Sequence, residues 1–228
     1  MADTSRPSRR FATSDAVLVV GLGRFGSATA LALSRVGHEV LAVDFDTALV
    51  QEWSGQLTHV VQADTTNETA LRQLGAGEFK LAVVAIGTDV EASLLTAAAL
   101  VDLGVQEIWA KAISAAHGRI LERIGVHHVV YPEASMGERV AHMITGKMID
   151  FIEFDDGFAI VKTRAPAEAV GKTLGESALR TKYGVTIVGI KRRGEDFTYA
   201  QADTLVHEGD LLIVAARTQA AERFAATT

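Results

Sequence analysis

The pattern of hydrophobic and polar positions divides the chain into two parts. In the first part, short apolar runs such as Val17–Val20 alternate with stretches that have helical spacing. Short continuous apolar runs are typical of strands buried on both faces of a parallel sheet. The pattern predicts strands at 17–20, 38–43, 58–62, 81–85, 107–111 and 128–131, and helices at 25–36, 46–55, 67–74, 90–103 and 115–124.

This alternation predicts the fold class of the first part. Strands that alternate with helices pair in parallel through right-handed crossovers. Six such strands make a doubly wound, Rossmann-type α/β sheet. We therefore expect a Rossmann nucleotide-binding domain over residues 15–134, preceded by a polar, disordered tail at 1–14.

The pattern changes after Glu133. A long helix-like stretch over 133–150 is interrupted by Gly137 and Gly146, and we interpret 135–150 as a linking helix. Short β runs follow at 158–163, 185–191 and 211–215, with one helix near 173–182. Residues 151–228 are therefore predicted to form a small α+β C-terminal lobe.

Composition narrows the classes of function. The chain has 228 residues, a net charge of −6 and no cysteine, which excludes disulfides and thiolate metal sites. The acidic balance is unlike the basic surface of a nucleic-acid binder, so we expect no nucleic-acid partner. No apolar stretch approaches the roughly 18 residues of a membrane span, and the polar start has no signal-peptide core. We expect a cytoplasmic protein.

A glycine motif carries the strongest chemical signal. Gly21-Leu-Gly-Arg-Phe-Gly26 directly follows the first predicted strand and opens the first helix. In this context Gly21 permits a tight turn, Gly23 lets backbone N–H groups approach a diphosphate, and Gly26 allows close helix–strand packing. The helix N-terminus adds free N–H groups and partial positive charge. The motif, with Phe25 inside it, predicts a dinucleotide- or nucleotide-binding loop.

Further candidates follow the later strands. Asp44 ends the second strand and is expected to bind the adenosine ribose hydroxyls, which favours NAD, ADP or ATP over NADP; alternatively it caps a helix or is a loop acid. Asp64 is placed near the adenine or caps the following helix. Ala85, Ile86 and Gly87 offer backbone atoms across the crevice.

Arg24 distinguishes this loop from that of a dehydrogenase. A guanidinium beside the phosphates favours a ligand with more negative charge, such as ATP or ADP, unless the side chain is only a solvated surface arginine. Hydride transfer also needs an acid or base near the nicotinamide, and the short second lobe offers no identifiable pair. We expect a binding protein rather than an enzyme. An NAD-dependent oxidoreductase and an NAD(H)-sensing regulator remain alternatives.

These residues resemble a known family. The chain is similar to the regulator-of-potassium-conductance (RCK) proteins, close to the Ktr/Trk potassium-uptake regulatory subunits of bacteria, from Val17 to Phe224. The matching stretches are Val20–Gly26, Gly37–Asp44, Val84–Gly87, Ile108–Ala112, Tyr131–Glu133, Met136–Gly137 and Lys182–Ile187. One nucleotide domain with one small lobe resembles the Ktr type rather than the doubled Trk type.

The resemblance implies a homo-oligomeric ring, typically an octamer, that docks beneath a separate integral-membrane potassium transporter at the inner face of the membrane. ATP would favour the active ring and ADP the inactive one. It implies that Arg24 reaches the γ-phosphate and that Glu133 helps hold Mg²⁺ or Ca²⁺ at a dimer interface. Lys111 matches a family lysine at the ligand edge and is otherwise a surface lysine.

The resemblance also implies a second candidate ligand. Some family members bind cyclic di-AMP where two C-terminal lobes pair. Arg180, Lys191 and Arg192 are the candidate cations for such a dianion here, and a solvated basic face is the alternative.

Overall fold

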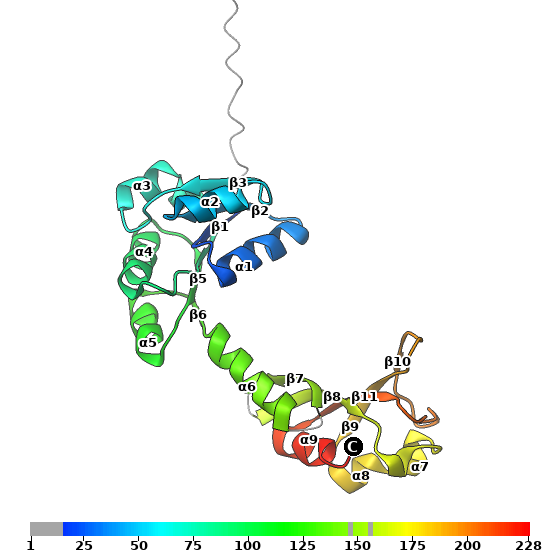
Figure 1. The fold of residues 1–228 in the computed structure, drawn as a ribbon. Helices are drawn as coiled ribbons and strands as arrows, with labels where there is room; N and C mark the ends of the chain where they lie inside the picture. Colours follow the sequence, from blue (N-terminus) through cyan, green and yellow to red (C-terminus); the bar gives the residue numbers. More distant parts are fainter. Residues whose placement is uncertain (1–15, 146–147, 155–156) are drawn as a thin grey trace, which may run out of the picture. The chain divides into compact units, whose positions relative to one another are not determined.

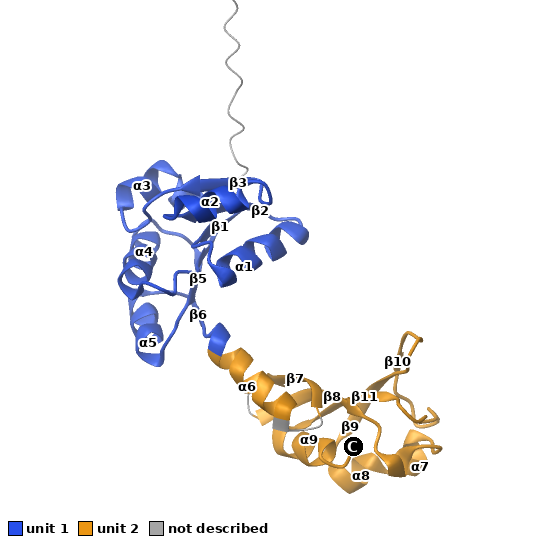
Figure 2. Ribbon diagram, viewed as in Figure 1, with its two compact units in different colours: residues 1–133 blue, residues 134–228 orange. Residues whose placement is uncertain are grey.

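A computed structural model describes residues 16–145, 148–154 and 157–228. The predicted tail at 1–14 and Gly146 lie outside the described residues. The chain divides into two compact units, residues 1–133 and 134–228 (Figure 2). Each unit has its own sheet and its own hydrophobic core, so each is described separately.

The first unit contains a six-stranded parallel sheet, which confirms the predicted fold class. Its strand order is β3-β2-β1-β4-β5-β6, the doubly wound order. The strands are β1 (Ala16–Val20), β2 (Glu39–Asp44), β3 (His59–Gln62), β4 (Leu81–Val84), β5 (Glu107–Lys111) and β6 (His128–Val130). The order reverses between β1 and β4, so the crevice expected to receive a ligand opens at the carboxyl ends of these two strands.

Helices cover both faces of this sheet because successive residues of β1 point to opposite sides. Leu18 and Val20 belong to a core that includes Leu100, whereas Val17 and Val19 belong to the core on the other face. Figure 1 shows α1 and α2 on one face and α3, α4 and α5 on the other. The helices are α1 (Arg24–Arg35), α2 (Thr47–Trp53), α3 (Glu68–Gln73), α4 (Val90–Asp102) and α5 (Ala115–Ile124).

The second unit is a small lobe built on an antiparallel sheet of order β10-β9-β11-β8-β7 (Figure 1). Its core contains the fully buried side chains of Leu179, Leu212 and Phe224. The elements are α6 (Pro132–Thr145), which begins just before the division, β7 (Met148–Phe154), β8 (Phe158–Arg164), α7 (Leu174–Ser177), α8 (Leu179–Tyr183), β9 (Thr186–Lys191), β10 (Phe197–Tyr199), β11 (Leu211–Arg217) and α9 (Thr218–Ala225).

The prediction of a linking helix over 135–150 is wrong at the C-terminal end of that helix. The helix α6 ends at Thr145, and Met148–Asp150 belong to β7, which pairs antiparallel with β8. A short strand and a helical turn cannot be distinguished by local periodicity, and here the pairing with β8 decides. The arginine Arg139 of α6 forms an ion pair with Asp150 of the strand.

Other details of the lobe also differ from the prediction. The single helix expected near 173–182 is two short helices separated by Ala178, whose φ is +51°. The strands β7 and β10 and the helix α9 were not predicted. The strand β10 escapes sequence analysis because it has only three residues, all of them exposed, which is too short a run for alternation to identify a strand.

Candidate functional site

The candidate site lies at the carboxyl edge of the six-stranded sheet. Each parallel strand delivers its following residues to this edge, so positions far apart in the chain meet there. The predicted residues at this edge are Gly21–Gly26 after β1, Asp44 at the end of β2, Asp64 after β3, Ala85–Gly87 after β4, Lys111 at the end of β5 and Glu133 after β6.

Two of the three motif glycines are required by the geometry of the protein itself. Gly21 has a φ of +93°, a conformation that strains any residue with a side chain. A Cβ atom on Gly26 would lie 1.8 Å from the carbonyl oxygen of Gly21, so α1 packs against the loop only without one. Gly23 is different, because a Cβ there would meet nothing within 4 Å. The space beside Gly23 is therefore open to a ligand.

The N-terminus of α1 fits an anion. Gly23 is its N-cap residue and supplies no side-chain cap, and the first turn contains no acidic residue. The first N–H groups of a helix have no partner within the helix, and the helix dipole adds partial positive charge. Arg24 is the first helical residue and its side chain is exposed, which adds a full positive charge at the same end. This end of α1 can hold a phosphate.

Asp44 is tied to the glycine loop. One carboxylate oxygen accepts the N–H of Leu22 at 2.5 Å, and the other accepts the N–H of Asp46 at 2.8 Å. Asp46, not Asp44, caps α2, by accepting the N–H of Ala48. Asp44 is half-buried, and its oxygens retain lone pairs for ribose hydroxyls. The link to Leu22 was not predicted, because backbone N–H groups leave no signal in the sequence.

Asp64 does not cap α3. Its carboxylate accepts the N–H and the hydroxyl of Thr66 at 3.0 and 2.6 Å, whereas Asn67 caps the helix. Asp64 is exposed, as is Gln62 at the end of β3. The cap alternative is thus removed, and an exposed carboxylate remains at the outer end of the edge.

The segment after β4 continues the wall of the site. The N–H of Ala85 donates to the carbonyl of Val20 at 2.7 Å, which fixes this segment beside the glycine loop. A Cβ on Gly87 would lie 3.2 Å from the Nζ of Lys111, so Gly87 leaves room for that side chain. Ile86 is half-buried beside them.

Lys111 and Glu133 form the charged end of the site. The Nζ of Lys111 donates to Oε1 of Glu133 at 2.6 Å and lies 5.9 Å from the centre of the Phe25 ring. The Lys111 side chain is only 13% exposed, whereas that of Glu133 is 63% exposed. The bond from Lys111 holds the pKa of Glu133 below its usual value, with smaller contributions from its own backbone N–H and from the charge of Arg24. Glu133 is therefore an ionised carboxylate.

A divalent cation at this point would need further ligands. Among residues 16–145, 148–154 and 157–228, no group of three or more His, Asp or Glu side chains is arranged to hold a metal ion. Glu133 is one oxygen ligand of the kind that Mg²⁺ and Ca²⁺ prefer, and phosphate oxygens of a nucleotide are the natural complement. The residues fit a cation held together with a nucleotide rather than one held by the protein alone.

The structure does not bring the three candidate cyclic di-AMP residues together. The guanidinium of Arg180 donates to the hydroxyl of Thr186 at the start of β9, whereas Lys191 ends that strand. Six residues of strand span roughly 16 Å. Lys191 donates to the carbonyl of Glu195 in the turn that follows. A single anion site from these three cations is not present in one copy of the lobe.

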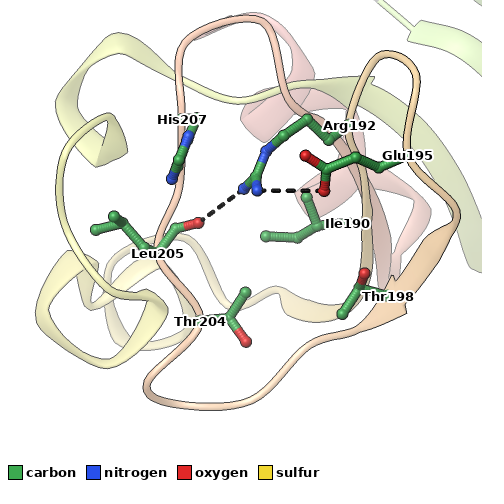
Figure 3. Close-up of a pocket in the computed structure, with 7 residues that line it drawn as sticks. All are labelled: Ile190, Arg192, Glu195, Thr198, Thr204, Leu205 and His207. Carbon is green, nitrogen blue, oxygen red and sulfur yellow. Dashed lines mark hydrogen bonds and ion pairs between the residues drawn. The ribbon is translucent and has the colours of Figure 1, made fainter.

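Arg192 has a structural role. Its Nε and Nη2 donate to the two carboxylate oxygens of Asp210 at 2.9 and 3.1 Å, and the Asp210 side chain is fully buried. Nη2 also donates to the carbonyl of Leu205, and Nη1 lies 3.4 Å from Glu195. Figure 3 shows the guanidinium pointing toward Leu205 and Glu195 in a small pocket, which is lined by Ile190, Arg192, Glu195, Thr198, Thr204, Leu205 and His207. Most N–H donors of the Arg192 guanidinium are therefore used within the lobe.

Comparison with known proteins agrees with this organisation. The TrkA-N domain family matches residues 17–132, and the TrkA-C domain family matches residues 158–227. Among the described residues, no helix combines the length and the apolar character needed to cross a bilayer.

Several curated proteins are similar over almost their whole length. The chain is 39% identical to Ktr system potassium uptake protein C of Bacillus subtilis, over 86% of this chain and 89% of that protein. It is 35% identical to Ktr system potassium uptake protein A of B. subtilis, over 90% of this chain and 93% of that protein. Ktr system potassium uptake protein A of Vibrio alginolyticus is also 35% identical, over 86% of this chain and 90% of that protein.

Solved structures share the fold. The GsuK RCK domain aligns with a TM-score of 0.68 at 21% identity, over 95% of this chain, which spans 48% of that chain. The GsuK channel bound to NAD gives the same TM-score at 20% identity, over 96% of this chain and 40% of that chain. The expected resemblance is confirmed: the chain belongs to the TrkA-N/TrkA-C (RCK) family of Ktr/Trk potassium-uptake regulatory subunits.

Proposed function

We propose that this protein is the regulatory subunit of a potassium uptake system, and that it binds ATP and ADP to control a separate membrane potassium transporter. The observation that carries the proposal is the charge arrangement around the glycine loop. The N-terminus of α1 has no side-chain cap and carries exposed Arg24, and Lys111, which pairs with Glu133, lies 5.9 Å from the ring of Phe25 in the same loop. The curated relatives are named potassium uptake proteins, which supports the same role.

The site has separate means of recognising each part of the nucleotide. Open space at Gly23 admits a diphosphate, and Asp44 offers carboxylate oxygens to ribose hydroxyls while it repels a 2′-phosphate. These features are common to ADP, ATP and NAD. Arg24 is the feature that adds selectivity, because a third phosphate increases the negative charge that its guanidinium can bind.

Glu133 makes binding of a third phosphate depend on a cation. A carboxylate near a triphosphate is repelled unless a cation lies between them, so Mg²⁺ or Ca²⁺ would be held by Glu133 and phosphate oxygens. When bound, the ion supplies charge neutralisation. Lys111, already hydrogen-bonded to Glu133, holds that carboxylate in its ionised form.

Such a site controls a partner by binding one state of the assembly better than another. A nucleotide with equal affinity for both states would shift nothing. Couplings of about 1–3 kcal/mol per site are typical and add over several copies in a ring. We propose an octameric ring at the cytoplasmic face of the membrane, acting without catalysis on the nucleotide. Native mass spectrometry of the intact protein tests the octamer, and incubation with ATP followed by nucleotide analysis tests for turnover.

The Arg24→Ala substitution tests the nucleotide assignment. Loss of a charge-assisted contact to the third phosphate should weaken ATP about 10- to 100-fold in titration calorimetry with Mg²⁺ and leave ADP nearly unchanged. Arg35→Ala is the matched control, because Arg35 is an exposed arginine in the last turn of the same helix. It should change neither affinity.

Two outcomes would contradict the proposal. An equal loss of ATP and ADP would show that Arg24 binds the shared phosphates or only the loop. Tight binding of NAD⁺ or NADH by the unaltered protein, with no measurable ATP binding, would instead identify a nicotinamide-sensing regulator.

A further inference from the structure

Phe45 is exposed in a way that neither the fold nor the predicted site explains. It directly follows Asp44, and its side chain is 74% exposed. A single exposed apolar residue is common on protein surfaces and needs no explanation by itself. Phe45 is distinguished by its position. It directly follows the end of β2 at the carboxyl edge of the sheet, where ligands of this fold bind.

The backbone that carries Phe45 is held on both sides. The carboxylate of Asp44 accepts the N–H of Asp46 at 2.8 Å, and the carbonyl of Phe45 accepts from Nε2 of Gln62 at 3.2 Å. Asp46 in turn caps α2 through the N–H of Ala48. Three hydrogen bonds therefore hold Phe45 and Asp46, the two residues between β2 and α2 (Figure 1). The ring projects from an ordered support.

The neighbours of Phe45 define what could lie against it. Asp44 is the ribose-binding candidate, so the base of a bound nucleotide would lie next to this residue in the direction away from the phosphates. Two groups at the end of β3, Gln62 and Asp64, are polar and exposed. They can meet the hydrogen-bonding edge of a base but offer it no apolar face. Phe45 supplies an exposed aromatic plane at that end.

We propose that Phe45 is the stacking platform for the base of the bound nucleotide, and so a specificity-determining residue of the site. The inference rests on the proposed nucleotide binding and deepens it. Stacking on an aromatic ring tolerates different bases because every base has a π-face, and it strengthens with the area of the base. Phe45 therefore favours a purine over a pyrimidine, and it contributes equally to ATP and ADP because both carry the same base.

The test compares Phe45→Ala with the unaltered protein by titration calorimetry of ATP, ADP and inorganic tripolyphosphate. We expect about a tenfold loss for both ATP and ADP, as is typical when an aromatic partner of a base is removed, and no change for tripolyphosphate. The preference for ATP over CTP should shrink as well. Phe45→Trp should retain the affinity of the unaltered protein, and Phe45→Leu should lose most of it, because leucine is apolar but not flat.

Val36→Ala is the matched control. Val36 is also 74% exposed, but it lies at the C-terminal end of α1 and should affect no nucleotide. If the unaltered protein binds ATP and Phe45→Ala binds it equally well, the inference is wrong while the proposed function stands. If Phe45→Ala alters the mass of the assembly but not nucleotide affinity, Phe45 is a contact between copies and the inference is likewise wrong. If the unaltered protein binds no adenine nucleotide, both fail.

Discussion

Two arginines show how surroundings set the role of one residue type. Arg24 stands exposed at a helix N-terminus, where its charge remains available to a ligand. Arg192 is bound bidentately to Asp210 and donates further to Leu205, so its charge is balanced within the lobe. Both were candidate ligand residues in the sequence. The Arg24 side chain is exposed beside the glycine loop, whereas most donors of Arg192 are used within the lobe.

The buried Asp210 predicts a loss of stability in acid. Burial raises its pKa, but the bonds from Arg192 and from the His207 N–H outweigh burial, so the pKa lies below its usual value. A carboxyl group whose pKa is lower in the folded state stabilises the fold above its unfolded pKa, and this contribution is lost as the pH falls through the folded pKa. We expect the free energy of unfolding of the second unit to decrease as the pH drops below about 4.

Urea denaturation of the full chain between pH 7 and pH 3 checks this. Arg192→Gln should destabilise the lobe at pH 7, and the difference from the unaltered protein should narrow as Asp210 becomes protonated. Asp203→Asn removes an exposed acid of the same lobe and should leave the pH dependence unchanged. A difference that stays constant over the whole range would argue against Asp210 as the titrating group.

At the scale of elements, single side chains cap four of the five helices α1 to α5. Asp46, Asn67, Asp89 and Ser114 each accept a backbone N–H at the start of α2, α3, α4 and α5. Among these five helices the start of α1 is the exception, because Gly23 provides no such cap. Within α1 to α5, the helix that opens the candidate site is therefore the one whose first N–H groups have no side-chain acceptor.

The Asn67→Ala substitution tests the role of these caps. Asn67 accepts the N–H groups of Thr69 and Ala70, so its loss should cost about 1 kcal/mol of stability in the first unit. Thermal or chemical denaturation with a probe for that unit measures the change. Thr69→Ala, which removes an exposed side chain from the same turn, should cost nothing, and equal losses for the two variants would contradict a capping role.

At the scale of the whole molecule, the two units have separate cores. Side chains from residues 16–126 form the cores on the two faces of the parallel sheet, and side chains from 148–225 form the core of the lobe. Since no buried core residue is shared, the units can unfold in separate steps, and a ligand of the first unit stabilises only the step in which that unit unfolds.

Leu212→Ala tests this independence. Leu212 is fully buried in the core of the lobe, and its truncation should cost about 2–5 kcal/mol there. In calorimetric scans with and without ATP, the substitution should lower the temperature of the transition that ATP leaves unchanged. The temperature of the other transition should still rise with ATP as it does in the unaltered protein. A single transition that responds to both ATP and the substitution would show that the units unfold together.

The sequence by itself determined the parallel sheet and the composition of its carboxyl edge. Apolar runs such as Val17–Val20 are local and record burial on both faces, and Gly21 and Gly26 record steric limits that only glycine meets. The positions of Asp44 and Lys111 at strand ends followed from the same periodicity, because parallel strands bring their carboxyl ends to one edge.

Only the tertiary structure decided what depends on partners distant in the chain. The residues 148–150 became strand rather than helix through pairing with β8, and Arg192 became a structural residue through Asp210, which lies 18 positions away. The pairing of Lys111 with Glu133 likewise spans 22 positions. The physical reason is that local propensity differs by only about 1 kcal/mol between alternatives, so pairing and burial between distant segments make the choice.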